Sequence, residues 1–544
     1  MSGWAFADIW EEIAAAVPNR TALIQGERTI SWGEFDARAN AIASFLLNAG
    51  LTHQSKVAVY LYNAPEYLET YYAAFKASFI PVNTNYRYSD QELTYLFDNA
   101  DAEAVVFHSS FAPLADQIRG RLPNIKVWLA VPQEGHPVPQ WAADYERIAA
   151  AGAPRLITPW GRSGDDLIFQ YTGGTTGMPK GVMWRQEDTF KALGGGSDLL
   201  IDNLPPLETV AEAGQRARAS EAKKPRIGII AAPLMHATAL NTAFPVLTRG
   251  HAVAVLPSRR FDAVELWNEV ERLGAISVAI VGQAFAMPML DALKAEPSRW
   301  NLSALRRIGS AGTMWSQENK LGLMEYIPAE CELFDSFGSS EAVGIGGSVS
   351  RAGKVAETAR FVVTPDATVF TEDGRRVKPG SGERGLIAVA GFMPVGYYKD
   401  PEKSALTFRE IEGRRWAIPG DFATIEADGT LKLLGRGSQV INTGGEKVFP
   451  EEVEEALKRH PNIRDAVVVG VADARFGERI CAIVELKSGA PAPDLAEVAA
   501  HVRQHLADYK APRELVLAPS GRAPNGKVDY KAAKALALEA LGHG

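Results

Sequence analysis

Short apolar runs rich in β-branched residues alternate with helical patterns through most of the chain, and this alternation restricts the fold more than any other feature. One unit begins with the strand pattern Val57–Tyr62, continues into a helix and ends in a second apolar run at Phe79–Val82. We expect Asn63 to cap that helix and Pro65 to lie in its first turn. The alternation predicts an α/β fold of parallel sheets covered by helices, with ligands bound at the carboxyl ends of the strands.

The same alternation returns in the middle of the chain. A helical pattern with its apolar residues on one face occupies Phe261–Leu273, between two further strand patterns. Residues 192–224, which begin with a triple glycine and continue into a charged run, look like a surface insertion. The strand patterns of this second series are Arg226–Ala231, His251–Leu256, Ile276–Val281, Leu305–Gly309 and Glu332–Asp335.

The pattern changes in the last third of the chain. Turn pairs at Asp373-Gly374 and Asp428-Gly429 lie between short apolar runs and predict hairpins in a small β-rich subdomain. A helix that begins at Pro450 follows, with two more strand patterns and a helix near Leu495–Leu506. We therefore expect a compact α+β domain at the end of the chain, joined near Gly435–Ser438.

Composition excludes several classes of function. The 544 residues carry a net charge of −8 and no basic block, which argues against a nucleic-acid partner. Cys331 and Cys481 are far apart and predict neither a disulfide framework nor a cysteine metal site. The start of the chain carries acids where a signal peptide needs a basic region, and no apolar run is long enough to cross a membrane. We expect a cytoplasmic protein that is not integral to a membrane.

The densest Gly and Thr stretch, Tyr171–Gly181, ends beside a lysine. It is not a Walker A loop, because Pro179 precedes Lys180 and Gly181 follows it, and it does not open a helix. Its glycines allow close approach of the backbone and its threonines add hydroxyl donors, as an anion-binding loop requires. By itself the stretch is also compatible with a plain turn between strands.

The order of several motifs resolves this question. Tyr171–Gly181 is followed by Phe337-Gly-Ser-Ser-Glu341, Gly420-Asp421, Gly435-Arg436 and Pro524-Asn-Gly-Lys527. In this order the motifs closely resemble the adenylate-forming superfamily of acyl-CoA synthetases, luciferases and peptide-synthetase adenylation domains. The resemblance implies a large N-terminal domain, residues 1–436, and a small mobile C-terminal domain, residues 437–544. It also implies two steps: a carboxylate attacks ATP to give acyl-AMP and pyrophosphate, and CoA then takes the acyl group.

The resemblance also implies roles for the motif residues. Glu341, and with it Thr172, is expected to bind Mg²⁺, while Asp421 and Arg436 bind the ribose. Lys527 is expected to orient the carboxylate against the α-phosphate. Ser340 stands where the family usually has threonine, and its hydroxyl can still meet that phosphate. The remaining ATP-binding residues are expected to be Gly173, Gly174, Thr175, Thr176, Gly177, Lys180, Ser310, Ala311, Gly312, Asp335, Ser336, Phe337, Gly338 and Ser339.

The second step needs a path for the pantetheine arm of CoA. Gly444, Gly445 and Glu446 are expected to form it, because a side chain at the glycines would obstruct the arm. Without the resemblance, a plain hairpin turn explains these glycines equally well. The hinge departs from the family, which commonly has Asp or Lys where this chain has Ser438. The hinge residue is therefore left open.

The resemblance implies an acyl pocket whose residues in this chain are mostly apolar or small, so we expect a hydrophobic carboxylic acid, either a fatty acid or a bulky ring-bearing acid. His236 is grouped with the catalytic residues as a gate or wall of the tunnel, because no carboxylate partner that would make it a base is evident. Two alternatives stay open: an acyl-AMP ligase that loads a carrier protein, and a non-catalytic acyl- or nucleotide-binding relative. A homodimer is the expected assembly. The pocket residues are expected to be His236, Phe285, Met287, Met314, Trp315, Val343, Gly344 and Gly346.

Overall fold

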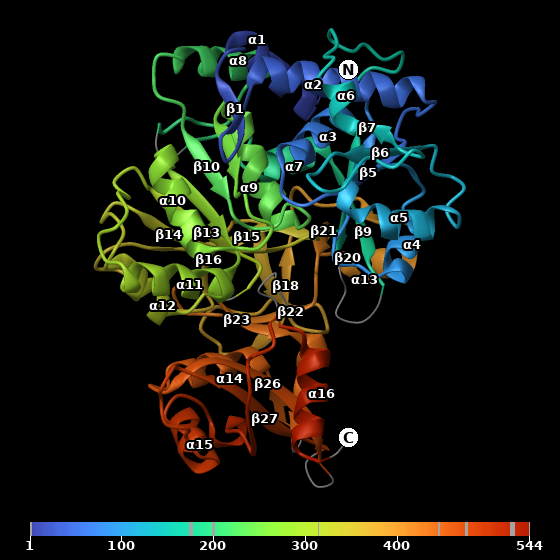
Figure 1. Ribbon diagram of the computed structural model, residues 1–544. Coiled ribbons are helices and arrows are strands. Elements are labelled where there is room, and N and C mark those ends of the chain that lie inside the picture. Colours follow the sequence, from blue (N-terminus) through green and yellow to red (C-terminus); the bar gives the residue numbers. More distant parts are fainter. Residues whose placement is uncertain are drawn as a thin grey trace.

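The computed structural model describes residues 3–172, 178–198, 202–313, 315–443, 446–473, 477–522 and 528–542. Two large sheets with their helices form the N-terminal part, and a third, smaller sheet forms the C-terminal part (Figure 1). The predicted α/β fold, with its β-rich subdomain and its small C-terminal domain, is confirmed.

The smaller of the two N-terminal sheets has eight strands in the order β19-β9-β8-β4-β3-β5-β6-β7. Its central strands β3, β4, β5 and β8 are parallel, whereas β8 and β9 form an antiparallel pair. The strands are β3 (Lys56–Tyr60), β4 (Ile80–Asn83), β5 (Ala102–His108), β6 (Val127–Val131), β7 (Ala143–Asp144), β8 (Leu167–Thr172), β9 (Lys180–Arg185) and β19 (Gly396–Tyr397).

The larger sheet begins as a parallel sheet and ends as the β-rich subdomain. Strands β1, β11, β10, β12, β13 and β14 are parallel neighbours, and β14 then pairs antiparallel with β15. All five strand patterns predicted for this region are confirmed within a few residues. The strands are β1 (Thr21–Gln25), β2 (Arg28–Ser31), β10 (Ile227–Ile230), β11 (Ala252–Val255), β12 (Ser277–Ile280), β13 (Arg307–Ala311), β14 (Glu332–Ser339), β15 (Ala342–Ser350), β16 (Arg360–Val363), β17 (Ala367–Phe370), β18 (Arg384–Val389), β20 (Phe408–Ile411), β21 (Arg414–Ala417), β22 (Asp421–Ile425) and β23 (Leu431–Arg436).

Helices join the two sheets through one apolar core. Helix α3 packs on β3 and β4, and α9 packs on β10 and β11. The rings of Phe75 from α3 and Phe244 from α9 lie 5.9 Å apart, and Phe6 from α1 packs on Phe244 at 5.0 Å. The helices of the N-terminal part are α1 (Phe6–Ala16), α2 (Trp32–Asn48), α3 (Pro65–Lys76), α4 (Asp90–Asn99), α5 (Ala112–Arg119), α6 (Tyr145–Ala149), α7 (Gln186–Ala192), α8 (Val210–Ala219), α9 (Ala237–Thr248), α10 (Ala263–Leu273), α11 (Gly282–Ala295), α12 (Gln317–Met324) and α13 (Pro401–Thr407).

One local prediction was wrong, and another was incomplete. The N-cap of α3 is Ala64, without a side-chain cap, while the Asn63 amide reaches the other sheet and donates to the carbonyl of Ala232 at 2.9 Å. Residues 192–224 are more than a surface insertion, because they contain α8, which packs against α1. The approach is close: a Cβ at Gly214 would lie 2.7 Å from the carbonyl oxygen of Glu12.

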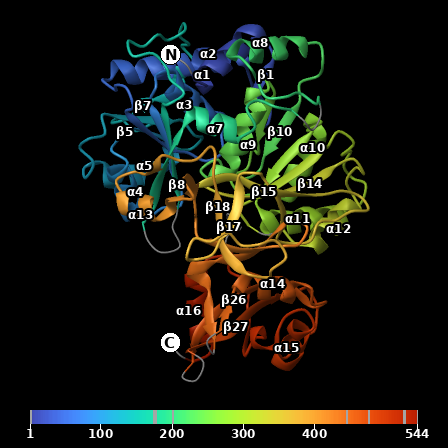
Figure 2. The ribbon, with the colours of Figure 1, turned by 180° about the vertical axis from the view of Figure 1, so that it is seen from behind.

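The C-terminal sheet has an apolar core on each face. Helices α14 and α15 cover one face and α16 covers the other. Figure 2 shows this unit from behind, below the N-terminal part and next to β17 and β18. No helix of the described residues is long and apolar enough to span a membrane. The elements are β24 (Ile441–Thr443), β25 (Glu446–Val448), α14 (Pro450–Lys458), β26 (Ile463–Asp473), β27 (Gly477–Leu486), α15 (Leu495–Arg503), β28 (Glu514–Leu517) and α16 (Tyr530–Ala540).

Exposed ion pairs connect the C-terminal unit to the N-terminal part. Arg464 of β26 lies 3.1 Å from Asp291 of α11, and Lys487 lies 3.5 Å from Glu318 of α12. Pairs of this kind contribute about 0–1 kcal/mol each, so they hold the unit weakly. The domain boundary between residues 436 and 437 stays a prediction.

Candidate functional site

The Gly and Thr stretch connects β8 to β9. Thr172 and Lys180 are register partners at the end of this antiparallel pair, so the stretch begins and ends at one point of the sheet. The Lys180 ammonium forms an ion pair with Asp400, the N-cap of α13. This hydrogen bond from Lys180 lowers the pKa of the Asp400 carboxyl. Residues 173–177, and with them the predicted phosphate ligands Gly173, Gly174, Thr175, Thr176 and Gly177, lie outside the described residues.

Two of the segments expected to bind ATP lie on neighbouring strands. Ser310 of β13 is in register with Asp335 of β14, and Ala311 with Ser336. One face of the Phe337 ring stacks on Phe361 of β16 at 5.2 Å. Parallel pairing therefore brings the Ser310–Gly312 and Asp335–Ser340 segments together, as the predicted nucleotide site requires.

Buried hydrogen bonds fasten these strands to the helices behind them. Ser310 Oγ accepts from the backbone N–H of Gly282, the first residue of α11, at 2.8 Å. Gln283 of α11 accepts from the backbone of Ser316, the N-cap of α12, at 3.2 Å. The start of α11, the start of α12 and the end of β13 thus form one hydrogen-bonded assembly.

Asp335 does not face solvent. Its carboxylate is buried and accepts from the ammonium of Lys320 of α12 at 3.1 Å. Burial raises the pKa of Asp335 to about 6, although Lys320 opposes the shift. Sequence reasoning missed Lys320, which carries no motif and lies on a different element from Asp335.

Glu341 lies next to the strand pair that carries the Gly and Thr stretch. Its carboxylate accepts from the hydroxyl of Tyr397 at 2.7 Å, and Tyr397 is in register with Val182 of β9. The backbone carbonyl of the neighbouring Ser340 accepts from Trp184 of β9 at 2.8 Å. Sequence reasoning missed Tyr397, because only the pairing of β19 with β9 brings it to the glutamate.

Another residue that sequence reasoning missed is Asn83, at the end of β4. Its buried amide group donates to the carbonyls of Tyr171 and Met235 and accepts from the N–H of Tyr171. The side chain thus ties the end of β8 to the segment that precedes His236. No motif marks Asn83, so only the fold reveals this contact.

The ribose residues lie opposite each other on two strands. Asp421, at the start of β22, is buried and is in register with Arg436, the last residue of β23. The turn after β23 closes on the same place, because the N–H of Gly437 donates to the carbonyl of Gly420 at 3.1 Å. The side chain of Arg436 lies outside what the structure describes.

The predicted acyl residues come from four segments of the N-terminal part. His236 precedes α9 and is half-buried, and Phe285 of α11 is buried against Phe261 at 4.4 Å. Trp315 is fully buried, and its indole donates to Asn319 of α12 at 2.8 Å. The other described members are Met287 of α11 and Val343, Gly344 and Gly346 of β15, and Met314 lies outside the described residues.

The predicted CoA path and the C-terminal lysine lie mostly outside the described residues, which leave out Gly444, Gly445 and Lys527. Glu446 begins β25 and pairs with Thr443. The segment that contains Lys527 is flanked by a bridge between Arg522 and Val528, and Arg522 donates to the buried Asp465 at 2.5 Å. Asp465 therefore holds Arg522, the last described residue before that segment.

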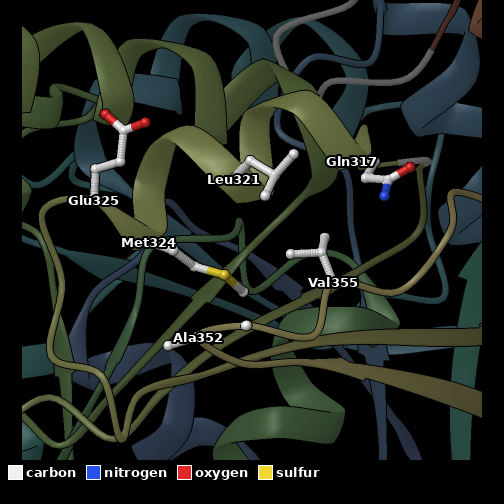
Figure 3. A pocket seen from close by; sticks show the side chains of 7 residues that line it. Gln317, Leu321, Met324, Glu325, Ala352 and Val355 are labelled. Carbon is white, nitrogen blue, oxygen red and sulfur yellow. The ribbon is translucent and has the colours of Figure 1, made fainter.

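A hollow of about 530 Å³ lies on the surface beside α12, and none of the residues that line it is a predicted site residue. Leu321 and Met324 of α12 approach Val355 across it, and Glu325 stands at its edge (Figure 3). Among the described residues, no cluster of three or more His, Cys, Asp and Glu side chains is arranged to hold a metal ion. The assignment of Glu341 and Thr172 to Mg²⁺ stays a prediction.

Comparison with known proteins agrees with the order of the motifs and with the fold. Residues 10–398 match the family of AMP-binding enzymes, and residues 452–527 match the AMP-binding enzyme C-terminal domain. The chain is 39% identical over 543 residues to the medium/long-chain-fatty-acid–CoA/3-oxocholest-4-en-26-oate–CoA ligase of Mycolicibacterium smegmatis, and the match covers 97% of this chain and 95% of that relative. It is 38% identical over 538 residues to the 3-oxocholest-4-en-26-oate–CoA ligase of Rhodococcus rhodochrous, with 97% of this chain and 95% of that relative covered.

The fold is also that of a solved structure, the anthranilate CoA ligase AuaEII in complex with anthranoyl-AMP. The TM-score is 0.84 at 21% sequence identity, with 99% of this chain and 98% of that chain covered. Family motifs in order, the pairing of their strands and matches over nearly the whole length lead to one conclusion. The chain belongs to the family of AMP-binding enzymes.

Proposed function

We propose that this protein is an AMP-forming acyl-CoA synthetase that activates a hydrophobic carboxylic acid with ATP and transfers the acyl group to CoA. One observation carries the proposal: the hydrogen bond from Tyr397 places the motif glutamate, Glu341, beside β9, which follows the Gly and Thr stretch. Relatives that are 37–39% identical to this chain bear the names of acyl-CoA ligases.

In the first step an oxygen of the substrate carboxylate bonds to the α-phosphorus of ATP, and the bond to the bridging oxygen breaks, so that pyrophosphate leaves. Lys180 and the Gly and Thr stretch bind the β- and γ-phosphates, and Lys527 orients the attacking carboxylate. Asp421 and Arg436 hold the ribose. A Mg²⁺ ion on Glu341 fits the hard oxygen donor present there and would offset negative charge on the phosphates.

In the second step the thiolate of CoA attacks the acyl carbonyl carbon, and AMP leaves. We propose that Gly444, Gly445 and Glu446 border the pantetheine arm. The substrates of the proposed reaction are ATP, CoA and the acid. The assignments of Mg²⁺, of a homodimer and of a cytoplasmic location rest on the sequence and stay predictions.

We propose a fatty acid or a bulky ring-bearing acid as the substrate. Phe285 and Met287 offer apolar surface, and the relatives named above are ligases of medium- and long-chain fatty acids or of a steroid side-chain acid. An amino acid is disfavoured, because the Pro233–His236 segment has no carboxylate to hold a substrate amine.

The proposal is tested by pyrophosphate release from ATP over a set of carboxylic acids, with and without CoA. We expect slow release without CoA, sustained turnover with CoA and an acyl-CoA product. Turnover that needs a carrier protein in place of CoA would favour the acyl-AMP ligase, and no release with any acid would favour a non-catalytic relative. In Lys527→Ala, release should be lost while thioester formation from supplied acyl-AMP persists.

A further inference from the structure

An ion pair is buried beneath the nucleotide strand. The Lys320 side chain is fully buried, and the side chain of Asp335 is 5% exposed. Burying two opposite charges costs desolvation energy, and an apolar pair of similar size usually holds two elements together as well. Packing alone therefore does not explain why α12 and β14 are joined by charges.

The position of Asp335 suggests what the pair does. Asp335, itself among the residues expected to bind ATP, is in register with Ser310 and directly precedes Ser336–Ser340, which are also expected to bind ATP. An ammonium that holds this carboxylate determines how β14 lies against α12. A displacement of β14 would misplace the residues expected to bind ATP, so such an anchor affects ATP binding without touching the substrate.

The C-terminal unit contacts the same helix, α12. Glu455 of α14 raises the pKa of Asp335, after the larger effects of burial and of Lys320. The neighbouring residues of α12 complete the connection, since Glu318 pairs with Lys487 of the C-terminal unit and Asn319 holds the indole of Trp315. Three consecutive residues, Glu318 to Lys320, thus contact the C-terminal unit, the acyl wall and the nucleotide strand.

We propose that Lys320 is a positioning residue for acyl-AMP formation, which acts through Asp335. The inference rests on the proposed function. Lys320 of α12 contacts Asp335 directly, whereas Glu455 of α14, which pairs with Lys458 at 3.1 Å, is a charged group that raises the pKa of the Asp335 carboxyl. They act in opposite directions: the ammonium keeps the carboxylate ionised, and Glu455 favours its protonated form.

The first experiment measures pyrophosphate release and ATP binding in Lys320→Met. Without the ammonium, Asp335 is protonated over a wider pH range and β14 loses its anchor. We expect the KM and the Kd for ATP to rise about tenfold or more at pH 7, with a smaller change in kcat. Lys320→Arg should restore most of the affinity, and Lys294→Met, at an exposed lysine of α11, is the matched control.

The second experiment is the pH profile of kcat/KM for ATP, which reports groups of the free enzyme. Its acid limb should move to higher pH in Lys320→Met and to lower pH in Glu455→Gln, while Lys294→Met leaves it in place. A structural role alone would reduce the amount of active enzyme and leave the limb unchanged. Unchanged ATP affinity in Lys320→Met, or limbs that move in the same direction in both variants, would overturn the proposal.

The two proposals fail in different ways. If the unaltered chain releases no pyrophosphate with any acid, the proposed function is wrong. If the unaltered chain does release pyrophosphate, and Lys320→Met is folded and binds ATP as tightly as the unaltered chain, only the positioning role is wrong. Far-UV circular dichroism and the Tm of each variant establish that it is folded before the kinetics are compared.

Discussion

The hydroxyl of Tyr397 donates to Glu341 at 2.7 Å, although the two residues are 56 positions apart in the sequence. Glu341 lies in the turn between β14 and β15 of the larger sheet, whereas Tyr397 ends β19 of the smaller sheet. The contact orients the carboxylate that we expect to bind Mg²⁺. Partners of this kind typically change metal affinity by 10- to 100-fold when they are removed.

Tyr397→Phe should therefore raise the Mg²⁺ concentration needed for half-maximal pyrophosphate release by about tenfold. The ring stays in place, so the fold should be unaffected. Tyr398→Phe is the matched control, because Tyr398 donates to Asp101, on the other side of the strand pair. If both variants needed the same Mg²⁺ concentration, the result would contradict the assignment of Glu341 to the metal site.

Asp400→Asn should bind pyrophosphate about threefold more tightly, because the Lys180–Asp400 pair must break before Lys180 can contact a phosphate, and exposed pairs contribute up to about 1 kcal/mol. Asparagine still caps α13. Isothermal titration with pyrophosphate measures the effect, and Asp366→Asn, which breaks the exposed pair with Arg414, is the control. Weaker binding in Asp400→Asn would mean that Asp400 holds Lys180 in its working position.

Asp465 predicts how the C-terminal unit responds to acid. Burial raises the pKa of this carboxyl, but the charges of Lys458 and Arg522 outweigh burial and lower it to about 2. A pKa that is lower in the folded state stabilises the fold above the unfolded value of 3.8, and this contribution, about 2 kcal/mol, is lost as the pH falls from 3.8 through about 2.

Asp465→Asn should accordingly lose stability at neutral pH and show a smaller further loss between pH 4 and pH 2 than the unaltered chain, as measured by denaturant unfolding. Because Asp465 also anchors Arg522, acyl-AMP formation should slow more than thioester formation from supplied acyl-AMP. If both steps slowed equally, Asp465 would not act through the segment that contains Lys527.

The acyl pocket predicts the order of substrates. Each buried methylene contributes about 0.8 kcal/mol, or about fourfold in kcat/KM, so activity should rise from acetate to hexanoate and dodecanoate. A ring-bearing acid should also be accepted. A preference for acetate or for an amino acid would contradict the proposed substrate class, and a flat series would mean that the acyl group stays in water.

Local sequence was sufficient for the elements and the order of motifs. Strand patterns such as Ile276–Val281 became β12, and the Asp428-Gly429 pair became the turn between β22 and β23, because buried strands and tight turns depend on neighbouring residues. The error at Asn63 has a long-range cause, since its side chain binds the backbone of Ala232, far away in the sequence. Helix α8 was missed because its buried face consists of small residues such as Ala213 and Ala217. Without large apolar residues at helical spacing, the segment looked like a polar insertion.

The sequence by itself determined the fold class, the family and most of the residues proposed for ATP, because each motif is a short run whose backbone and side chains act together. Only the tertiary structure decided which partners hold those residues. The pairs Lys320–Asp335, Tyr397–Glu341 and Lys180–Asp400 each join residues on separate elements. Their contacts arise from helix packing and strand pairing across the sheets, so no local pattern of the chain could have indicated them.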